Sequence, residues 1–259
     1  TSLSPTHTSL PRWRSSLVAR WLMGPCGNKG WEGGGPSDGA ARAASSVEVA
    51  PTPPSARRPV LECSRADCRW YTSHYCEENS LRLCNHLLGR AESDGVQLSV
   101  VFVSNAARQV PVWFQRLADR RDEPVLWDYH VILLAQHPHG NWVYDLDSTL
   151  DFPSQASLYM TQAFRKRMNI DQQYRQMFRV VPARECVEHF SSDRSHMMEE
   201  GGGYSAQPPG FPPLRRGPRA TSSNNMNEWI NMDATTGRGR VLNLEEMEAF
   251  VARGPHRFT

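Results

Sequence analysis

Apolar residues between Cys76 and about Arg90 recur every three or four positions, which is the spacing of one face of a helix. Acidic and polar residues open this segment, where a first helical turn accommodates them. We therefore predict a helix from Cys76 to about Arg90. Its apolar face consists of Leu81, Cys84, Leu87 and Leu88.

Stretches rich in branched and aromatic residues indicate β-strands. The longest such stretch runs from Val125 to Ala135, and the turn residues of 137–141 separate it from a return strand. This pattern favours the α/β (α+β) class, with a mainly antiparallel sheet packed against helices. The predicted strands are Val96 to Val103, Val110 to Phe114, Val125 to Ala135, Trp142 to Leu146 and Met177 to Val181.

Two further helices and one loop are predicted in the second half of the chain. A polar helix is expected from Ser154 to Arg167. Asn243 and Glu246 have the spacing of a capping box, which predicts the start of a C-terminal helix. Gly, Pro, Ser and Arg dominate residues 201–225, so we expect an exposed loop there.

The first 58 residues differ from the rest, because Ser, Pro, Gly, Ala and Arg dominate them without helical or strand periodicity. Such a composition buries too little apolar surface to offset the entropy of ordering. We predict a disordered basic extension over residues 1–58, followed by a single catalytic domain over 59–259. The early part of this extension is basic and poor in acidic residues, as organellar transit peptides are.

Charge and cysteine usage narrow the possible partners. The chain has 29 basic and 27 acidic residues, so the concentrated basic face that nucleic acid requires is not expected. No stretch approaches the roughly 20 apolar residues that cross a bilayer, so we expect no membrane insertion. Six cysteines in a chain of 259 residues favour reduced thiols over a disulfide framework. Reduced thiols favour a cytosolic protein.

Cys76, His130 and Asp145 are the candidate catalytic residues. His130 is polar among apolar residues of its predicted strand face, and Asp145 lies on the next strand. A four-residue loop from Gln136 to His139 would place Asp145 directly opposite His130, and a shift of two residues would substitute Asp147. The chain order Cys, His, Asp matches that of papain-like thiol enzymes.

The predicted helix places Cys76 at its N-terminus, where unpaired amides and the helix dipole stabilise a thiolate. His130 would accept the thiol proton, and the carboxylate would orient the imidazole. Glu77 and Glu78 would oppose the thiolate if they pointed at the sulfur. We therefore predict that both turn toward solvent or toward a cationic part of the substrate.

Structural interpretations of the same residues stay open at this point. A strand histidine is often a satisfied core residue, Asp145 could cap a turn, and the remaining cysteines are expected to be small buried side chains. The arginines near 215–219 are expected in a solvated loop. A zinc site is a further alternative, although the ligand spacing is poor. Its candidate ligands are Cys63, Cys68, His74, Cys76, Cys84 and His86.

Four motifs in this order resemble the protein N-terminal glutamine amidohydrolase family, which is named for its WDYHV motif. The resemblance spans roughly Glu62 to Arg253. The motifs are Tyr75-Cys76-Glu77-Glu78-Asn79, Trp127-Asp128-Tyr129-His130-Val131, Tyr144-Asp145-Leu146-Asp147 and Ser192-Asp193-Arg194-Ser195-His196-Met197.

The resemblance implies a papain-like or transglutaminase-like thiol hydrolase fold. It also implies that Cys76 is the nucleophile, His130 the base and acid, and Asp145 the orienting carboxylate. The implied substrates are proteins and peptides with an N-terminal glutamine, converted to glutamate with release of ammonia, which feeds the N-degron pathway. The reaction requires no metal and no cofactor.

Recognition of the substrate's free α-ammonium requires an acceptor, because a buried cation must be paired. Glu77, Asp128 and Asp193 are the candidates, and Arg194 is expected in a structural salt bridge. Two other functions stay open. One is a thiol protease or a transglutaminase-like acyl transferase on the same scaffold, and the other is a non-catalytic protein that binds N-terminal residues.

Overall fold

The computed structural model describes residues 58–166, 170–214 and 217–253. Its centre is a six-stranded sheet in the order β6-β5-β4-β1-β7-β8, in which every neighbouring pair is antiparallel. The predicted antiparallel sheet is therefore confirmed, while the predicted extension lies outside the described residues except for Arg58. The six strands are β1 (Gln97–Ser104), β4 (His130–His137), β5 (Gly140–Tyr144), β6 (Ser154–Gln155), β7 (Met177–Pro182) and β8 (Arg240–Asn243).

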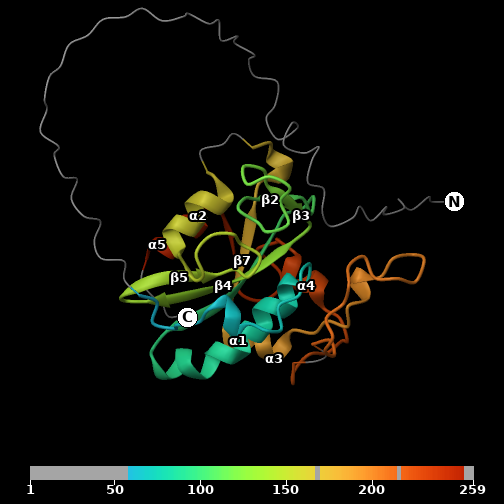
Figure 1. The fold of residues 1–259 in the computed structure, drawn as a ribbon, viewed down its shortest axis with the longest axis horizontal. Helices are drawn as coiled ribbons and strands as arrows, with labels where there is room; N and C mark the ends of the chain where they lie inside the picture. Colours follow the sequence, from blue (N-terminus) through green and yellow to red (C-terminus); the bar gives the residue numbers. More distant parts are fainter. Residues whose placement is uncertain (1–57, 167–169, 215–216, 254–259) are drawn as a thin grey trace, which may run out of the picture.

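Helices cover both faces of this sheet (Figure 1). Helices α1 (Cys76–Ser93), α3 (Ala183–His189) and α4 (Met226–Ile230) lie on one face, and α2 (Ala156–Phe164) and α5 (Leu244–Ala252) lie on the other. Strand β1 shows how one segment serves both layers. Val100 and Phe102 pack on the α1 side, whereas Val101 and Val103 pack on the α2 side, because successive side chains of a strand alternate.

Helix α1 begins at Cys76, as predicted, and continues three residues beyond Arg90 to Ser93. Leu81, Cys84 and Leu87 of its apolar face are buried. The hydroxyl of Ser80 donates a 2.7 Å hydrogen bond to the carbonyl of Val131, the second residue of β4. This contact holds the first turns of α1 against the start of the strand that carries His130.

The predicted strand from Val125 to Ala135 is wrong as a single element. Val125–Trp127 forms β3, which pairs with β2 (Val110–Val112) in a separate two-stranded sheet, and β4 begins only at His130. Asp128 interrupts the strand because its carboxylate accepts the Tyr129 N–H at 2.9 Å. Ser104 also donates to the Asp128 carbonyl, at 2.7 Å.

The predicted register of the hairpin between β4 and β5 is also wrong. His137 pairs with Gly140 and Leu133 with Tyr144, so the turn contains only Pro138 and His139 instead of four residues. This is the alternative register, shifted by two residues. Asp145 still lies beside His130 despite this shift. Strand pairing ends at Tyr144, and the turn that follows brings the Asp145 side chain to the imidazole.

The C-terminal part of the domain contains both predicted and unpredicted elements. The capping box of Asn243 and Glu246 is confirmed at the start of α5, and both of its reciprocal hydrogen bonds are present. The sequence patterns did not reveal α3, α4, β6 or β8. Of residues 201–225, those that the structure describes contain no helix or strand. Part of this segment packs inward, since Pro209 is buried.

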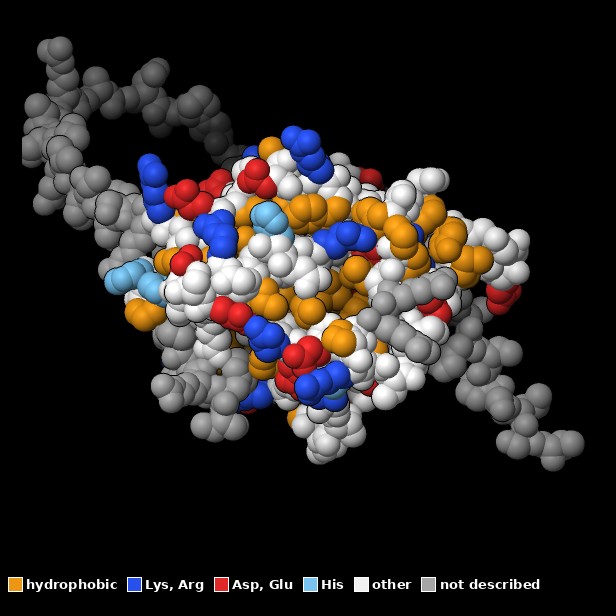
Figure 2. Space-filling model, turned by 90° about the horizontal axis from the view of Figure 1, so that it is seen from below, with side chains coloured by type: hydrophobic (Ala, Val, Ile, Leu, Met, Phe, Trp, Pro, Cys, Tyr) orange, Lys and Arg blue, Asp and Glu red, His pale blue; other side chains and the backbone are white. Residues whose placement is uncertain are grey.

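The surface near α1 and α3 carries mixed charge. Figure 2 shows this face from below the view of Figure 1, with basic and acidic side chains interspersed and hydrophobic side chains gathered around a hollow. Within the described ranges, none of the helices is long and apolar enough to cross a lipid bilayer.

Candidate active site

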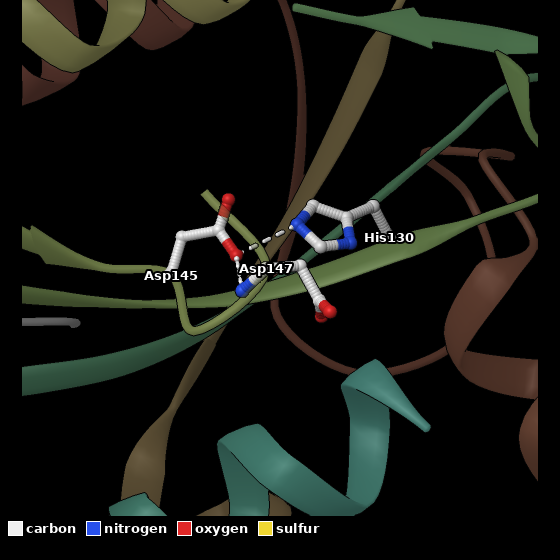
Figure 3. Close-up of side chains that lie close together, drawn as sticks. All are labelled: His130, Asp145 and Asp147. Atoms are coloured by element: carbon white, nitrogen blue, oxygen red, sulfur yellow. Dashed lines mark hydrogen bonds and ion pairs between the residues drawn. The ribbon is translucent and has the colours of Figure 1, made fainter. Parts of the chain in front are cut away.

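His130 and Asp145 lie in contact inside the domain, at the edge where β4 begins and β5 ends. The imidazole Nε2 is 3.1 Å from Asp145 Oδ1, and both side chains are buried (Figure 3). His130 Nδ1 forms no hydrogen bond within the described part of the chain. The ring of Trp127 stacks on the imidazole with centroids 5.0 Å apart, which restricts how the ring can turn.

Asp145 is held by a donor of its own turn and by donors from two other segments. Its Oδ1 accepts the Asp147 N–H at 2.9 Å, and its Oδ2 accepts the Gln115 amide at 3.1 Å and the Tyr159 hydroxyl at 2.8 Å. Gln115 follows β2 and Tyr159 belongs to α2. Sequence reasoning missed both residues, because no local motif connects them with Asp145.

The pair shifts the pKa of each partner in the direction that favours an ion pair. Burial, the largest single influence, lowers the pKa of His130, but Asp145, Asp147 and Glu77 together raise it by more, so the net pKa is raised. Burial alone raises the pKa of Asp145, yet His130, Gln115 and Tyr159 together hold it below its ordinary value. An imidazolium formed here is therefore stabilised by its neighbour.

Asp147 lies beside this pair and behaves differently. Burial, followed by repulsion from Asp145, raises its pKa to about 6, although His130 and a hydrogen bond from Tyr71 oppose the shift. The Tyr71 hydroxyl donates to Asp147 Oδ1 at 2.8 Å. Tyr71 comes from the segment that leads into α1, so this hydrogen bond connects that segment to the loop after β5.

His130, Asp145 and Asp147 are the only group of three or more His, Cys, Asp or Glu residues within metal-binding distance in the described ranges. Their donor atoms all lie within 4.8 Å of one another. Protein donors already contact both oxygens of Asp145 and Oδ1 of Asp147, so a cation would have to displace these contacts. The zinc alternative among the cysteines and histidines of 63–86 is wrong, since those residues form no such group.

Cys76 is the first residue of α1, and Glu77 lies beside its sulfur. The Sγ atom is 3.7 Å from Glu77 Oε2, and both side chains are buried. The prediction that Glu77 and Glu78 turn toward solvent is therefore wrong, because neither is exposed. Glu77 also raises the pKa of His130, as one of several carboxylates near the imidazole, which places this turn of α1 near His130.

A second histidine approaches Glu77 from the far side of the site. His196 Nε2 lies 3.3 Å from Glu77 Oε1, within ion-pair distance but outside hydrogen-bond alignment. The same nitrogen is 3.1 Å from the Tyr129 hydroxyl. The His196 side chain is 18% exposed, so this cluster lies closer to the surface than His130.

Glu78 is neutralised by Arg194, which confirms the predicted structural salt bridge. Two guanidinium nitrogens donate to the two carboxylate oxygens at 2.6 and 2.8 Å, and the pair is buried. Arg194 also donates to the carbonyls of Pro209 and Phe211. The pair therefore fastens the first turn of α1 to the segment around 209–211.

The two remaining candidate acceptors lie in turns. Asp128 is half-buried and its carboxylate accepts the Tyr129 N–H. Asp193 accepts from the Ser195 N–H, the Ser223 hydroxyl and the Asn224 amide. Although burial works in the opposite direction, these donors hold the pKa of Asp193 well below its ordinary value. The oxygens of Asp193 thus accept from its own turn and from the Ser223–Asn224 segment.

Comparison with known proteins gives one consistent family. A family model described as N-terminal glutamine amidase matches residues 71–251. The protein N-terminal glutamine amidohydrolase of Homo sapiens is 39% identical over 177 residues, which cover 68% of this chain and 84% of the human protein. That of Drosophila mojavensis is 37% identical over 192 residues, 74% of this chain and 92% of the relative.

The similarity extends to plants and includes the site. The protein N-terminal glutamine amidohydrolase of Arabidopsis thaliana is 43% identical over 149 residues, which cover 56% of this chain and 67% of the plant protein. The matched residues 71–251 contain Cys76, His130 and Asp145 together with the segments that hold them. The chain belongs to the N-terminal glutamine amidase family.

Proposed function

We propose that this protein deamidates the N-terminal glutamine of proteins and peptides, with Cys76, His130 and Asp145 as a catalytic triad. The observation that carries the proposal is the buried contact of 3.1 Å between His130 and Asp145, combined with membership of the family. Cys76 supplies the nucleophile from the N-terminus of α1, where helix amides favour an anionic sulfur.

The reaction proceeds through a thioester. His130 takes the proton of Cys76, and the thiolate attacks the side-chain amide carbon of the glutamine. The backbone N–H of Cys76 donates to the oxyanion, and His130 returns its proton to the departing ammonia. Water then loses a proton to His130 and attacks the thioester, which releases glutamate and regenerates the thiol. Asp145 stabilises the imidazolium in both halves of the cycle.

Glu77 is the group that we assign to the substrate's α-ammonium. It is buried, and its Oε2 lies 3.7 Å from the Cys76 sulfur, so this carboxylate stands beside the atom that attacks the substrate. An α-ammonium bound here would form a charge-assisted contact with that carboxylate. Asp128 and Asp193 are weaker candidates, because Asp128 accepts the adjacent Tyr129 N–H and Asp193 accepts from Ser195, Ser223 and Asn224.

The wider description of the protein follows from the same proposal. An antiparallel sheet with a cysteine at the start of a helix and a histidine on a strand supports a papain-like or transglutaminase-like scaffold. We assign the protein to the cytoplasm and nucleus as a monomer that acts on proteins destined for the N-degron pathway. We also propose that the catalytic domain begins at residue 59, after an N-terminal extension that ends at residue 58.

The central test uses a reduced, purified protein and a peptide that begins with glutamine. The wild type should release ammonia and increase the peptide mass by one dalton, whereas Cys76→Ala should lose activity by roughly 10⁴-fold or more. A peptide with an acetylated N-terminus is the matched substrate control and should not react. Cleavage of the peptide would instead indicate a thiol protease, and incorporation of an amine would indicate an acyl transferase.

A non-catalytic reader of N-terminal residues would give another result. Such a protein would bind the glutamine peptide equally well in the wild type and in Cys76→Ala, without release of ammonia from either. Alkylation of Cys76 by iodoacetamide provides a second readout, because a bound N-terminal glutamine peptide should slow it. Unchanged alkylation in saturating peptide would contradict a substrate site at this sulfur.

Glu77→Gln tests the assignment of the α-ammonium site. The substitution keeps the size of the side chain but removes its charge, so KM for an N-terminal glutamine peptide should rise by about 10-fold or more. The readout is kcat and KM for the peptide and for an analogue in which a hydroxyl replaces the α-amine. Wild type should prefer the amine strongly, and Glu77→Gln should lose most of this preference. An unchanged preference would exclude Glu77.

A further inference from the structure

Cys63 and Cys68 form a pair of free thiols in the segment that precedes α1. Their sulfurs are 3.9 Å apart, and both side chains are largely buried. A short 3₁₀-helix, Arg65–Asp67, lies between them, so the two cysteines close a single turn of the chain. A disulfide requires sulfurs about 2.05 Å apart, so the two sulfurs must move toward each other for the bond to form.

Cys63 keeps a small exposed fraction of 9%, whereas Cys84 and Cys186 in the core keep none. It lines a surface cavity of about 560 Å³ together with Glu62, Asp67 and Phe152. Cys84 and Cys186 are completely buried, and burial raises the pKa of both thiols. A small oxidant can therefore reach Cys63 through this cavity more readily than it can reach Cys84 and Cys186.

The two thiols of the pair have unequal acidity. The hydrogen bond with Cys68 lowers the pKa of Cys63, although burial opposes this shift. The same hydrogen bond, together with burial, raises the pKa of Cys68. This difference assigns the first step of an oxidation to Cys63, since the thiolate is the reactive form.

The turn between the two cysteines is connected to the loop that carries Asp145. Arg65 donates to the carbonyls of Ser148 and Leu150, at 2.8 and 2.7 Å. These residues follow Asp145 and Asp147 directly. A movement of the Arg65 turn therefore changes the contacts that hold the carboxylate loop of the candidate active site.

We propose that Cys63 and Cys68 are a peroxide-sensitive modification site, and that their disulfide lowers the activity of the enzyme by moving Arg65 away from Ser148 and Leu150. The formation of the disulfide concerns the thiol pair alone. The effect on activity rests on the proposed amidase function.

The oxidation balances with hydrogen peroxide as the two-electron oxidant. The Cys63 thiolate attacks one peroxide oxygen, an S–O bond forms, the O–O bond breaks, and the hydroxide released becomes water with a solvent proton. The Cys68 sulfur then attacks the Cys63 sulfur. The S–S bond forms, the S–O bond breaks, and the leaving hydroxide takes the Cys68 proton. Two thiols are oxidised, and one peroxide is reduced to two waters.

Trypsin mapping tests the disulfide independently of activity. Cys76→Ala in the full-length chain removes the other candidate for oxidation at the active site, and trypsin cuts after Arg65, between the two cysteines. After peroxide treatment, the two fragments should remain joined until a reductant separates them. Cys68→Ser in the same background should give separate fragments. Fragments that separate without reductant, or a cross-link to another cysteine, would overturn the proposal.

The effect on activity is tested in proteins that keep Cys76. Diamide-treated wild type should lose about threefold to tenfold in kcat/KM and regain it with dithiothreitol, a size typical of coupling through packed contacts. Cys68→Ser should have wild-type activity before treatment and keep it afterwards. The two proteins are compared at equal extents of Cys76 modification, measured by mass spectrometry. Equal losses in both proteins, or a mapped disulfide without loss, would overturn the coupling. Absence of any activity before treatment would count against the proposed function instead.

Discussion

Asp145 and Asp147 lie two residues apart in one buried turn, yet their pKa values move in opposite directions. Asp145 accepts from Gln115 and Tyr159 and faces His130, so its pKa is lowered despite burial. Burial is the largest influence on Asp147, and repulsion from Asp145 adds to it, so its pKa rises to about 6. The contact with His130 and the hydrogen bonds from Gln115 and Tyr159 make Asp145 the anionic partner of the histidine.

This difference predicts unequal effects of two matched substitutions. Asp145→Asn should lower kcat by roughly 10⁴-fold, because an amide neither stabilises the imidazolium nor holds the same tautomer. Asp147→Asn should lower kcat far less, since His130 keeps its direct partner. Steady-state kinetics with an N-terminal glutamine peptide measure both. Equal losses in the two variants would contradict the assignment of Asp145.

The pKa of the His130 imidazole should also reveal its contact with Asp145. Because Asp145 raises the pKa of His130, replacing it with asparagine should lower that pKa. An NMR titration of the His130 ring in wild type and in Asp145→Asn measures the change. An unchanged midpoint would show that Asp145 does not face the imidazole in solution.

At the level of single residues, sequence reasoning reached those that lie within recognisable motifs. It placed Cys76 at a helix start, where it lies, and it paired His130 with Asp145, which are in contact. It misjudged Glu77, because burial beside the sulfur depends on His196, more than a hundred residues away. Gln115 and Tyr159 were missed for the same reason, since only the tertiary fold brings them to Asp145.

Among the elements, α1 depends on a contact with a distant loop. The buried pair of Glu78 and Arg194 fastens its first turn to residues 209–211. Arg194→Met should lower the free energy of unfolding by about 3–5 kcal/mol, because it leaves Glu78 buried without a partner. Urea denaturation measures the loss.

Two comparison variants separate the ion pair from general effects of the substitution. Combining Arg194→Met with Glu78→Gln should recover part of the loss, since the buried charge is then removed. Arg184→Met breaks the partly exposed pair with Glu92 and should cost less than about 1 kcal/mol. If Arg194→Met and Arg184→Met lowered the free energy of unfolding equally, the pair of Arg194 and Glu78 would not stabilise α1.

The elements themselves were predicted with uneven success. Long, strongly periodic segments such as α1, β1 and β7 were found nearly within their true limits. The boundary at Asp128 was missed, because a side chain that accepts a backbone N–H interrupts a strand without changing the hydrophobic pattern. The short elements α3, α4, β6 and β8 were missed as well, since they carry too few residues to show a period.

For the whole molecule, the raised pKa of Asp147 makes stability depend on pH. A folded-state pKa of about 6, above the ordinary 3.8, means that the stability linked to the bound proton is complete below 3.8 and lost as the pH rises through about 6. Asp147→Asn should therefore gain stability relative to wild type between pH 5 and pH 8, by about 1 kcal/mol. Urea denaturation of both proteins at the two pH values gives this difference.

The comparison is informative because the other titrating groups are shared by both proteins. A difference that stays constant between pH 5 and pH 8 would show that the folded protein does not raise the pKa of Asp147.

The two-residue turn of Pro138 and His139 lies at the opposite end of the β4–β5 hairpin from His130 and Asp145. Strand β4 spans His130–His137, so the turn is on the order of 20 Å from the imidazole. Both turn residues are exposed. A fluorophore or a short peptide tag inserted there should leave turnover unaffected, which offers a handle for following the enzyme while it binds its protein substrates.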